Sequence, residues 1–250
     1  MPNSFKPMSA RELLMQSERE AASRVKDGKP LHLSPATIMD AAKDEATVYV
    51  YDAIGGWWGI DPKTWVPEFR AIKAKTIHLR INSPGGSVFD AETMRTAIAQ
   101  HSSNVVAHVD GIAASAATSV AIAANEVEMS SGAMFMIHNA WGLAMGGAKE
   151  MRDYADLLEK INGNIRTEYG RKTGKGEEEL AGLMDAETWF TAAEALENGF
   201  VDRIFNAVDS DEDDDANNAA ATVAPGVNVA SGEADKARRE RALLLAEIGM

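Results

Sequence analysis

Cysteine is missing from the chain, which has 250 residues. Its absence excludes disulfide bonds, zinc sites built on thiolates and a cysteine nucleophile together. It is compatible with a reducing compartment, where structural disulfides are rare. A covalent mechanism in this protein would therefore need a different nucleophile.

Basic residues are scarce relative to acidic ones. The chain has 25 Lys and Arg residues against 38 Asp and Glu residues, which gives a formal net charge of −13. Proteins that bind nucleic acid normally carry an excess of Lys and Arg to meet the phosphate backbone. Nucleic acid is therefore not expected as a direct partner. Part of the imbalance is local, because acidic residues crowd into the run 209–215.

Long hydrophobic runs and a nucleotide-binding loop are missing as well. Residues 1–16 contain no apolar stretch of the kind found in secretory signals. The longest run of small apolar residues, 111–124, is too short and too weakly apolar to span a bilayer. We therefore expect no membrane partner. No GxxxxGKS/T motif is present, so an ATP-driven motor would have to be a separate protein.

Composition divides the chain into four segments. We expect an N-terminal accessory arm, in which Ser9 and Glu12 have the spacing of a capping box before a charged helical pattern. The long acidic and small-polar segment near the C-terminus has little that could form a core, which is typical of a flexible linker. The expected segments are the arm (1–45), a folded domain (46–206), the acidic linker (207–232) and a C-terminal helix or tail (233–250).

The central domain alternates strand-like and helix-like patterns. Runs rich in β-branched and apolar residues predict strands at 47–51, 76–81, 105–109, 126–129 and 134–137. Apolar residues at helical spacing predict helices at 88–100, 112–124 and 148–169. Strands that alternate with helices indicate an α/β fold with helical crossovers.

Two segments rich in small residues have the composition of a reactive site. The loop "NSPGGSV" (82–88) follows a strand, and its two glycines allow a backbone that exposes N–H groups to an anion. Ser115 follows a strand that is expected to end at Asp110 and Gly111, and it begins a helix whose free N–H groups would stabilise an oxyanion. Taken alone, the glycine loop is explained by a tight strand-to-helix turn, and Ser115 is explained by a close helix contact that needs a small residue.

A serine nucleophile needs a base and a carboxylate. His138 follows a predicted strand and begins a glycine-containing loop, and α/β folds commonly place catalytic or binding residues at such positions. Asp185 and Glu187 precede an aromatic pair and are the candidate carboxylates. Asp153 and Asp156 lie on the expected helix at 148–169 and are expected to face outward. The other histidines are His32, His78, His101 and His108.

Four blocks, in this order and spacing, resemble the ClpP-type serine peptidases. They are "INSPGGSV", "DGIAASAA", "MIHNAW" and "WFTAAEALENGFVD", and the resemblance covers about 47–205. Two segments most resemble the ClpP-related head maturation (prohead) proteases of tailed phages and prophages: "WWG" at 57–59 and "MDAETWFTAAEA" at 184–195. The resemblance implies an α/β ClpP/crotonase-like fold of stacked ββα repeats with a protruding handle helix.

The resemblance also implies a role for each matching position. Ser115 matches the family nucleophile and His138 matches the general base. The family acid falls at Glu187, where the family usually has Asp, and this departure leaves Asp185 as the alternate acid.

Gly86 and Ala116 match the positions whose amides form the oxyanion hole. The implied activity is a serine-type endopeptidase that works through an acyl-enzyme, with no metal or cofactor. The helix at 148–169 aligns with the family handle, which implies a homo-oligomeric ring or stacked rings. The implied substrates are capsid or scaffold proteins inside a phage prohead, in the cytoplasm of the host cell.

Two other functions fit part of the pattern. A crotonase-like acyl-CoA enzyme also holds an oxyanion with two backbone amides but needs no Ser–His–acid set. A catalytically silent capsid assembly or scaffolding component would keep the peptidase fold, and the acidic linker and terminal helix would suit it.

Overall fold

The computed structural model describes residues 38–40, 43–55 and 59–206, together with a few residues between 9 and 23. Most of the expected arm, the linker at 207–232 and the terminal helix at 233–250 lie outside the described residues, as does His32. Within the arm, Ser9 and Glu12 form the expected capping box. The Ser9 N–H donates to the Glu12 carboxylate at 2.8 Å, and the Glu12 N–H donates to the Ser9 hydroxyl at 3.3 Å.

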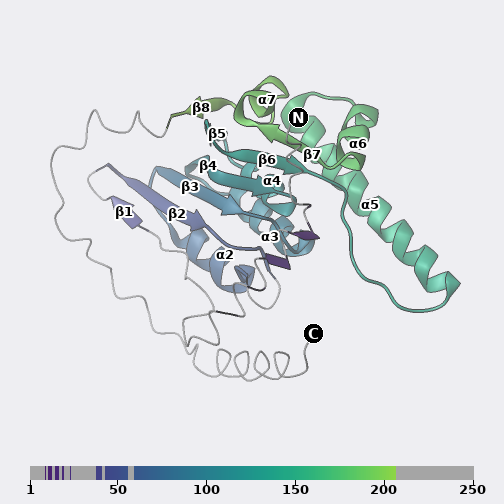
Figure 1. Ribbon diagram of the computed structural model, residues 1–250. Helices are drawn as coiled ribbons and strands as arrows, with labels where there is room; N and C mark the ends of the chain where they lie inside the picture. Colours follow the sequence, from purple (N-terminus) through teal and green to yellow (C-terminus); the bar gives the residue numbers. More distant parts are fainter. Residues whose placement is uncertain are drawn as a thin grey trace.

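A mostly parallel sheet forms the centre of the described residues (Figure 1). Its main path runs in the order β1-β2-β3-β4-β5-β8, and all neighbours along it are parallel except the antiparallel pair of β1 and β2. The expected α/β class is therefore confirmed. The strands on this path are β1 (Ile38–Asp40), β2 (Glu45–Val50), β3 (Thr76–Ser83), β4 (Asn104–Ala114), β5 (Glu126–Ser130) and β8 (Arg203–Phe205).

Strand β4 changes partner halfway along its length. Its first half pairs with β5 as far as Val109, and its last three residues, 112–114, pair with β6 (Met134–Ile137). Strand β6 in turn pairs antiparallel with β7 (Thr188–Thr191). The expectation that β4 ends at Asp110 and Gly111 was wrong, and so was the helix at 112–124. Residues 112–114 are held in the ladder with β6, so the helix that follows, α4, is only Ala116–Ala121.

Helices pack against this sheet in sequence order. α2, α3 and α4 lie one beside the next (Figure 1). Neither α2 nor α6 was predicted from the sequence. Asp61 caps α2 by accepting the Lys63 N–H at 2.9 Å, and three glutamates occupy the first turn of α6. The helices are α2 (Pro62–Ala71), α3 (Val88–Ala99), α4 (Ala116–Ala121), α5 (Ala148–Thr173), α6 (Glu177–Asp185) and α7 (Ala192–Glu197).

The long helix α5 projects beyond the body of the domain (Figure 1). Its N-terminal half is largely exposed, with Met151 at 39% exposure. Its C-terminal half reaches the core, where Ile165 packs against it and Tyr169 is buried. The protruding handle that the resemblance implied is therefore present. No described helix is long and apolar enough to cross a membrane.

Phe200 joins the elements that surround the C-terminal half of α5. Its side chain is fully buried, and its ring centroid lies 5.3 Å from Phe135 on β6, 5.5 Å from Tyr169 on α5 and 5.2 Å from Phe190 on β7. Aromatic rings at these separations add to the stabilisation that burial provides. Phe200 therefore fixes how β6, β7 and α5 meet.

We predict that Phe200→Ala lowers the free energy of unfolding by about 3–5 kcal/mol, because it opens a cavity at the contact of three rings. The matched control is Leu157→Ala on α5, where the side chain is 44% exposed. It should cost less than about 1 kcal/mol. Denaturant unfolding curves of the two variants and the wild type measure both values. Equal losses in the two variants would contradict the central role of Phe200.

Candidate active site

Ser115 lies at the junction of β4 and α4 in an unusual backbone conformation. Its φ is 54° and its ψ is −128°, values that a residue with a side chain adopts only when its surroundings enforce them. The Ser115 N–H donates to the Met136 carbonyl at 2.9 Å, and the Ser115 carbonyl accepts the Thr118 hydroxyl at 2.5 Å. The ladder to β6 and the first turn of α4 therefore hold the serine from both sides.

A buried tyrosine extends this support. The hydroxyls of Thr118 and Tyr169 lie 2.6 Å apart. Because Thr118 gives its proton to the Ser115 carbonyl, the Tyr169 hydroxyl is the donor to Thr118. Tyr169 was not predicted from the sequence to support the site, although it continues the apolar stripe of α5 four residues beyond Ile165.

The glycine loop lies directly against the serine. Gly85 has a φ of 91°, and a Cβ built on it would lie 2.8 Å from the Ser115 Cβ and 2.9 Å from the Ala116 N. Any side chain at this position would therefore displace Ser115 or the start of α4. The small residues on both sides allow this close approach, and Ala116 and Ala117 are buried beneath the serine.

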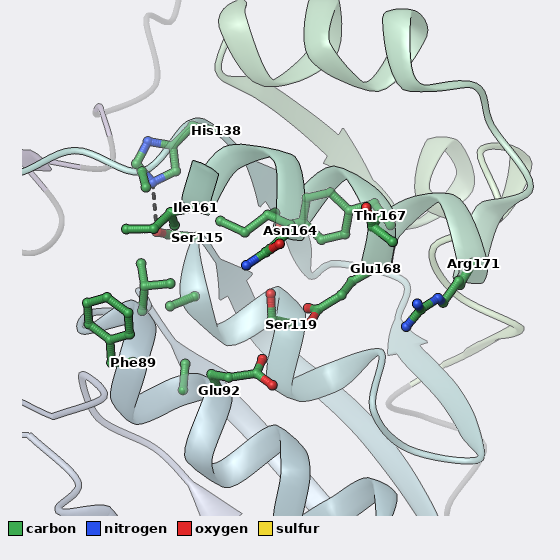
Figure 2. Close-up of a pocket in the computed structure, with 16 residues that line it drawn as sticks. Phe89, Glu92, Ser115, Ser119, His138, Ile161, Asn164, Thr167, Glu168 and Arg171 are labelled. Atoms are coloured by element: carbon green, nitrogen blue, oxygen red, sulfur yellow. Dashed lines mark hydrogen bonds between the residues drawn. The ribbon is translucent and has the colours of Figure 1, made fainter. Parts of the chain in front are cut away.

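His138 lies beside Ser115 because of the register between β4 and β6. Ala114 pairs with Met136, so the residues that follow the two strands emerge together. The His138 Nε2 and the Ser115 Oγ are 2.7 Å apart, the contact drawn as a dashed line in Figure 2. Burial lowers the pKa of His138 below its ordinary value of 6.5, and the charge of Glu187 opposes this shift. The imidazole is therefore neutral near pH 7 and able to accept a proton.

The two candidate carboxylates have different surroundings. In the antiparallel pair of β6 and β7, Ile137 is opposite Thr188, so Glu187 lies on the His138 side of the ladder, and its charge acts on the imidazole. Asp185 is exposed and accepts the Asn139 side-chain amide at 2.6 Å. The structure therefore brings Glu187, rather than Asp185, to His138.

The loop around Gly86 lies beside Ser115 and His138. The Ile54 N–H donates to the Gly85 carbonyl at 2.8 Å, and the Ser87 N–H donates to the Ile54 carbonyl at 2.8 Å. These two bonds fix the backbone on either side of Gly86, whose φ is 147°.

Gly86, Ser115 and His138 are among the residues that line a cavity of about 210 Å³. Ala116 begins α4, where amides have no partner within the helix. The residues that the resemblance assigns to an oxyanion hole therefore lie at or beside Ser115.

Three of the remaining histidines lie away from this site. The rings of His78 and His108 are 2.9 Å apart, Nδ1 to Nε2, between β3 and β4, and burial lowers the pKa of His108 to about 3. His101 follows the end of α3 and accepts a hydrogen bond from the Ser103 N–H.

Asp153 and Asp156 are exposed on α5, as expected. Among the described side chains, no group of three or more His, Asp or Glu is arranged to hold a metal ion.

Comparison with known proteins identifies the family. The family model for Clp protease matches residues 69–208. The chain belongs to the Clp protease family. The enzyme is therefore of the serine peptidase type, and the candidate site described above lies within the matched region.

Individual relatives agree with this assignment. The chain is 31% identical over 182 residues to the ATP-dependent Clp protease proteolytic subunit 1 of Protochlamydia amoebophila, covering 70% of this chain and 87% of the relative. It is also 31% identical over 134 residues to the subunit of the same name from Prochlorococcus marinus, covering 53% and 68%.

A solved structure supports the fold. A mutant of ClpP1 from Listeria monocytogenes superposes with a TM-score of 0.58 at 24% identity, covering 65% of this chain and 92% of that one. The expected ClpP fold is confirmed.

We predict that an NMR titration of this Clp family member places the pKa of His138 below 6.5, because burial disfavours the imidazolium. Glu187→Gln should lower that pKa further, because it removes the negative charge that favours the protonated ring. The matched control, Asp185→Asn, should change it much less. A larger change of the His138 pKa in the Asp185 variant would show that Asp185, and not Glu187, is the carboxylate that acts on the imidazole.

Proposed function

We propose that the protein is a serine endopeptidase in which Ser115 is the nucleophile, His138 the general base and Glu187 the acid that orients the imidazole. The observation that carries this proposal is the 2.7 Å contact between the His138 Nε2 and the Ser115 Oγ, made by a serine whose backbone is held in an unfavourable conformation. A pair of this kind at the start of a helix is the arrangement that activates a hydroxyl.

The chemistry is acyl transfer to the serine. His138, neutral because its pKa is lowered by burial, takes the Ser115 proton as the oxygen attacks a peptide carbonyl. The amides of Gly86 and Ala116 stabilise the oxyanion, and each such donor contributes about 3–4 kcal/mol to the transition state. The protonated imidazole gives its proton to the leaving amine, and water then hydrolyses the acyl-enzyme.

Glu187 replaces the aspartate that is usual in the family. Its φ of 48° shows that the chain turns sharply between α6 and β7 at the residue that carries the carboxylate. We infer that this turn compensates for the extra methylene of glutamate. Asp185 remains the alternate acid, and its hydrogen bond to Asn139 supports a structural role for it instead.

The Ser115–His138 pair also favours a peptidase over the two other functions. A crotonase-like enzyme needs the backbone amides but has no use for a hydroxyl bonded to an imidazole. A silent assembly component has no reason to keep a serine in an unfavourable backbone conformation.

We predict that Ser115→Ala lowers kcat/KM for peptide cleavage by at least about 10³-fold and abolishes labelling by a fluorophosphonate. Glu187→Gln should lower kcat by about 100-fold or more, because the imidazole loses the group that orients it and stabilises its charge. Asp185→Asn should change kcat by less than about threefold. Peptide turnover and intact-mass measurement of the labelled protein test the set. Full labelling of the Ser115→Ala variant would disprove the assignment of the nucleophile.

We further propose that the enzyme works as a homo-oligomeric ring or pair of rings in the host cytoplasm and processes capsid or scaffold proteins during phage head maturation. The "WWG" and "MDAETWFTAAEA" segments support the phage sub-type. The exposed apolar side chains of Trp141, Leu143 and Met145, in the loop before α5, support contacts between copies. The curated relatives are named ATP-dependent proteolytic subunits, so proteins unfolded by a separate ATPase are the competing substrates.

We predict that co-expression with the capsid and scaffold proteins of the same genome yields shortened products with the wild type and intact proteins with Ser115→Ala. The two samples differ in one hydroxyl, so every difference in cleavage depends on the proposed nucleophile. Mass spectrometry of the two mixtures locates the cleaved bonds. Identical products from both enzymes would argue against head maturation.

A further inference from the structure

The larger of the two cavities beside Ser115 has an acidic end. It has a volume of about 280 Å³ and lies between α3, α4 and α5 (Figure 2). Ser115 and His138 line it at one end. Apolar side chains line part of its wall, among them Val88, Phe89, Ile161 and Ile165, and Asn164 and Thr167 of α5 add polar groups.

At the other end of the cavity, polar groups converge. The carboxylate of Glu92 on α3, the hydroxyl of Ser119 on α4 and the carboxylate of Glu168 on α5 point toward one another across the cavity (Figure 2). The cavity therefore begins at the nucleophile, continues along apolar side chains and ends at hydrogen-bond acceptors.

One guanidinium is shared by the two carboxylates at this end. The Arg95 Nε lies 2.6 Å from Glu92 Oε2 and 3.0 Å from Glu168 Oε1, and a second Arg95 nitrogen lies 2.7 Å from Glu92 Oε1. When both carboxylates are ionised, their contact with one cation leaves one negative charge in excess. Arg171, which also lines the cavity, is exposed to solvent, so its charge is screened.

The protonation of Glu168 reflects this shortage of positive charge. Burial and the neighbouring Glu92 raise the pKa of Glu168 to about 7, and Arg95 and Arg171 only partly oppose the shift. The other groups near this carboxyl are neutral at pH 7. Burial raises the pKa of Tyr169 to about 12 and lowers the pKa of His138, and α4 contributes only the Ser119 hydroxyl.

We propose that this cavity is the subsite for the substrate residue whose carbonyl Ser115 attacks, and that Glu168 and Glu92 make it select lysine or arginine there. The inference rests on the proposed peptidase function. The aliphatic stem of either side chain would lie along Phe89, Ile161 and Ile165, and the cationic head would reach the two carboxylates. Long basic side chains bury their stems on apolar surface in this way while the charge finds a polar partner.

The arrangement also disfavours other side chains. A leucine would fill the apolar part and leave the two carboxylates with Arg95 as their shared cation, and a glutamate would add a third negative charge beside them. Lysine and norleucine differ only in the terminal ammonium, so their comparison isolates the acidic end of the cavity.

We predict that an N-acylated diphenyl phosphonate of lysine inactivates the full-length enzyme about tenfold faster or more than its norleucine counterpart, as expected for a charge-assisted hydrogen bond. The Ser115 oxygen forms a bond to phosphorus and phenol leaves, so intact mass counts the modified protein. Glu168→Gln should reduce the ratio of the two rates about tenfold. The matched control is Glu178→Gln, an exposed glutamate on α6, which should keep the wild-type ratio.

The pH dependence of the same ratio is a second readout. Because Glu168 becomes charged as pH rises through about 7, the preference for lysine should increase between about pH 6 and about pH 8. Titration of His138 affects both probes equally and cancels in the ratio. In Glu168→Gln the ratio should not change with pH.

The outcomes separate this inference from the proposed function. A small fluorophosphonate, which carries no amino-acid side chain, reports whether Ser115 is reactive and whether the Glu168 variant still forms its active site. Labelling by that reagent together with equal rates for lysine and norleucine overturns the basic subsite and leaves the peptidase standing. A preference for norleucine, or for a glutamine phosphonate over the lysine one, overturns it too. No labelling by any probe overturns both.

Discussion

The exchange of partners along β4 is the constraint on which the site depends. Up to Val109 the strand belongs to the ladder with β5, and from Ile112 it belongs to the ladder with β6. The second ladder brings the ends of two parallel strands together, so Ser115 and His138 emerge side by side. Strand β7 is paired with β6 in turn, and it carries Glu187 to the same edge. Three residues far apart in sequence are therefore aligned by hydrogen bonds of the main chain.

Burial changes the pKa of two groups that line the same cavity, in opposite directions. It lowers the pKa of His138 and raises the pKa of Glu168, because in both cases it disfavours the charged form. A neutral imidazole is the state that a general base needs. A carboxyl with a pKa near 7 becomes charged across the neutral range, so its attraction for a second cation increases as pH rises. One physical effect thus keeps the proposed base neutral and makes the charge in the neighbouring cavity dependent on pH.

Much of the strand and helix content could be predicted from sequence, because runs such as 76–81 and 134–137 combine β-branched and apolar residues. The site was predicted because a serine among alanines and a histidine at a strand end fit a known family. The extension of β4 to Ala114 could not be predicted, since alanines suit a buried helix as well as a buried strand. Sequence also left Asp185 and Glu187 open, because only the register of β7 on β6 decides which one lies nearer to His138.

Helix α5 contributes to both the proposed catalytic site and the proposed specificity through consecutive residues. Glu168 faces the cavity toward α3, and Tyr169 faces α4, where its hydroxyl supports Thr118 and, through it, the Ser115 carbonyl. Neighbouring residues of a helix point about 100° apart. One position of α5 against the body of the domain must therefore allow both contacts. Phe200 packs on Tyr169 and fixes the position of α5, so the proposed nucleophile and the acidic end of the cavity depend on the same aromatic cluster.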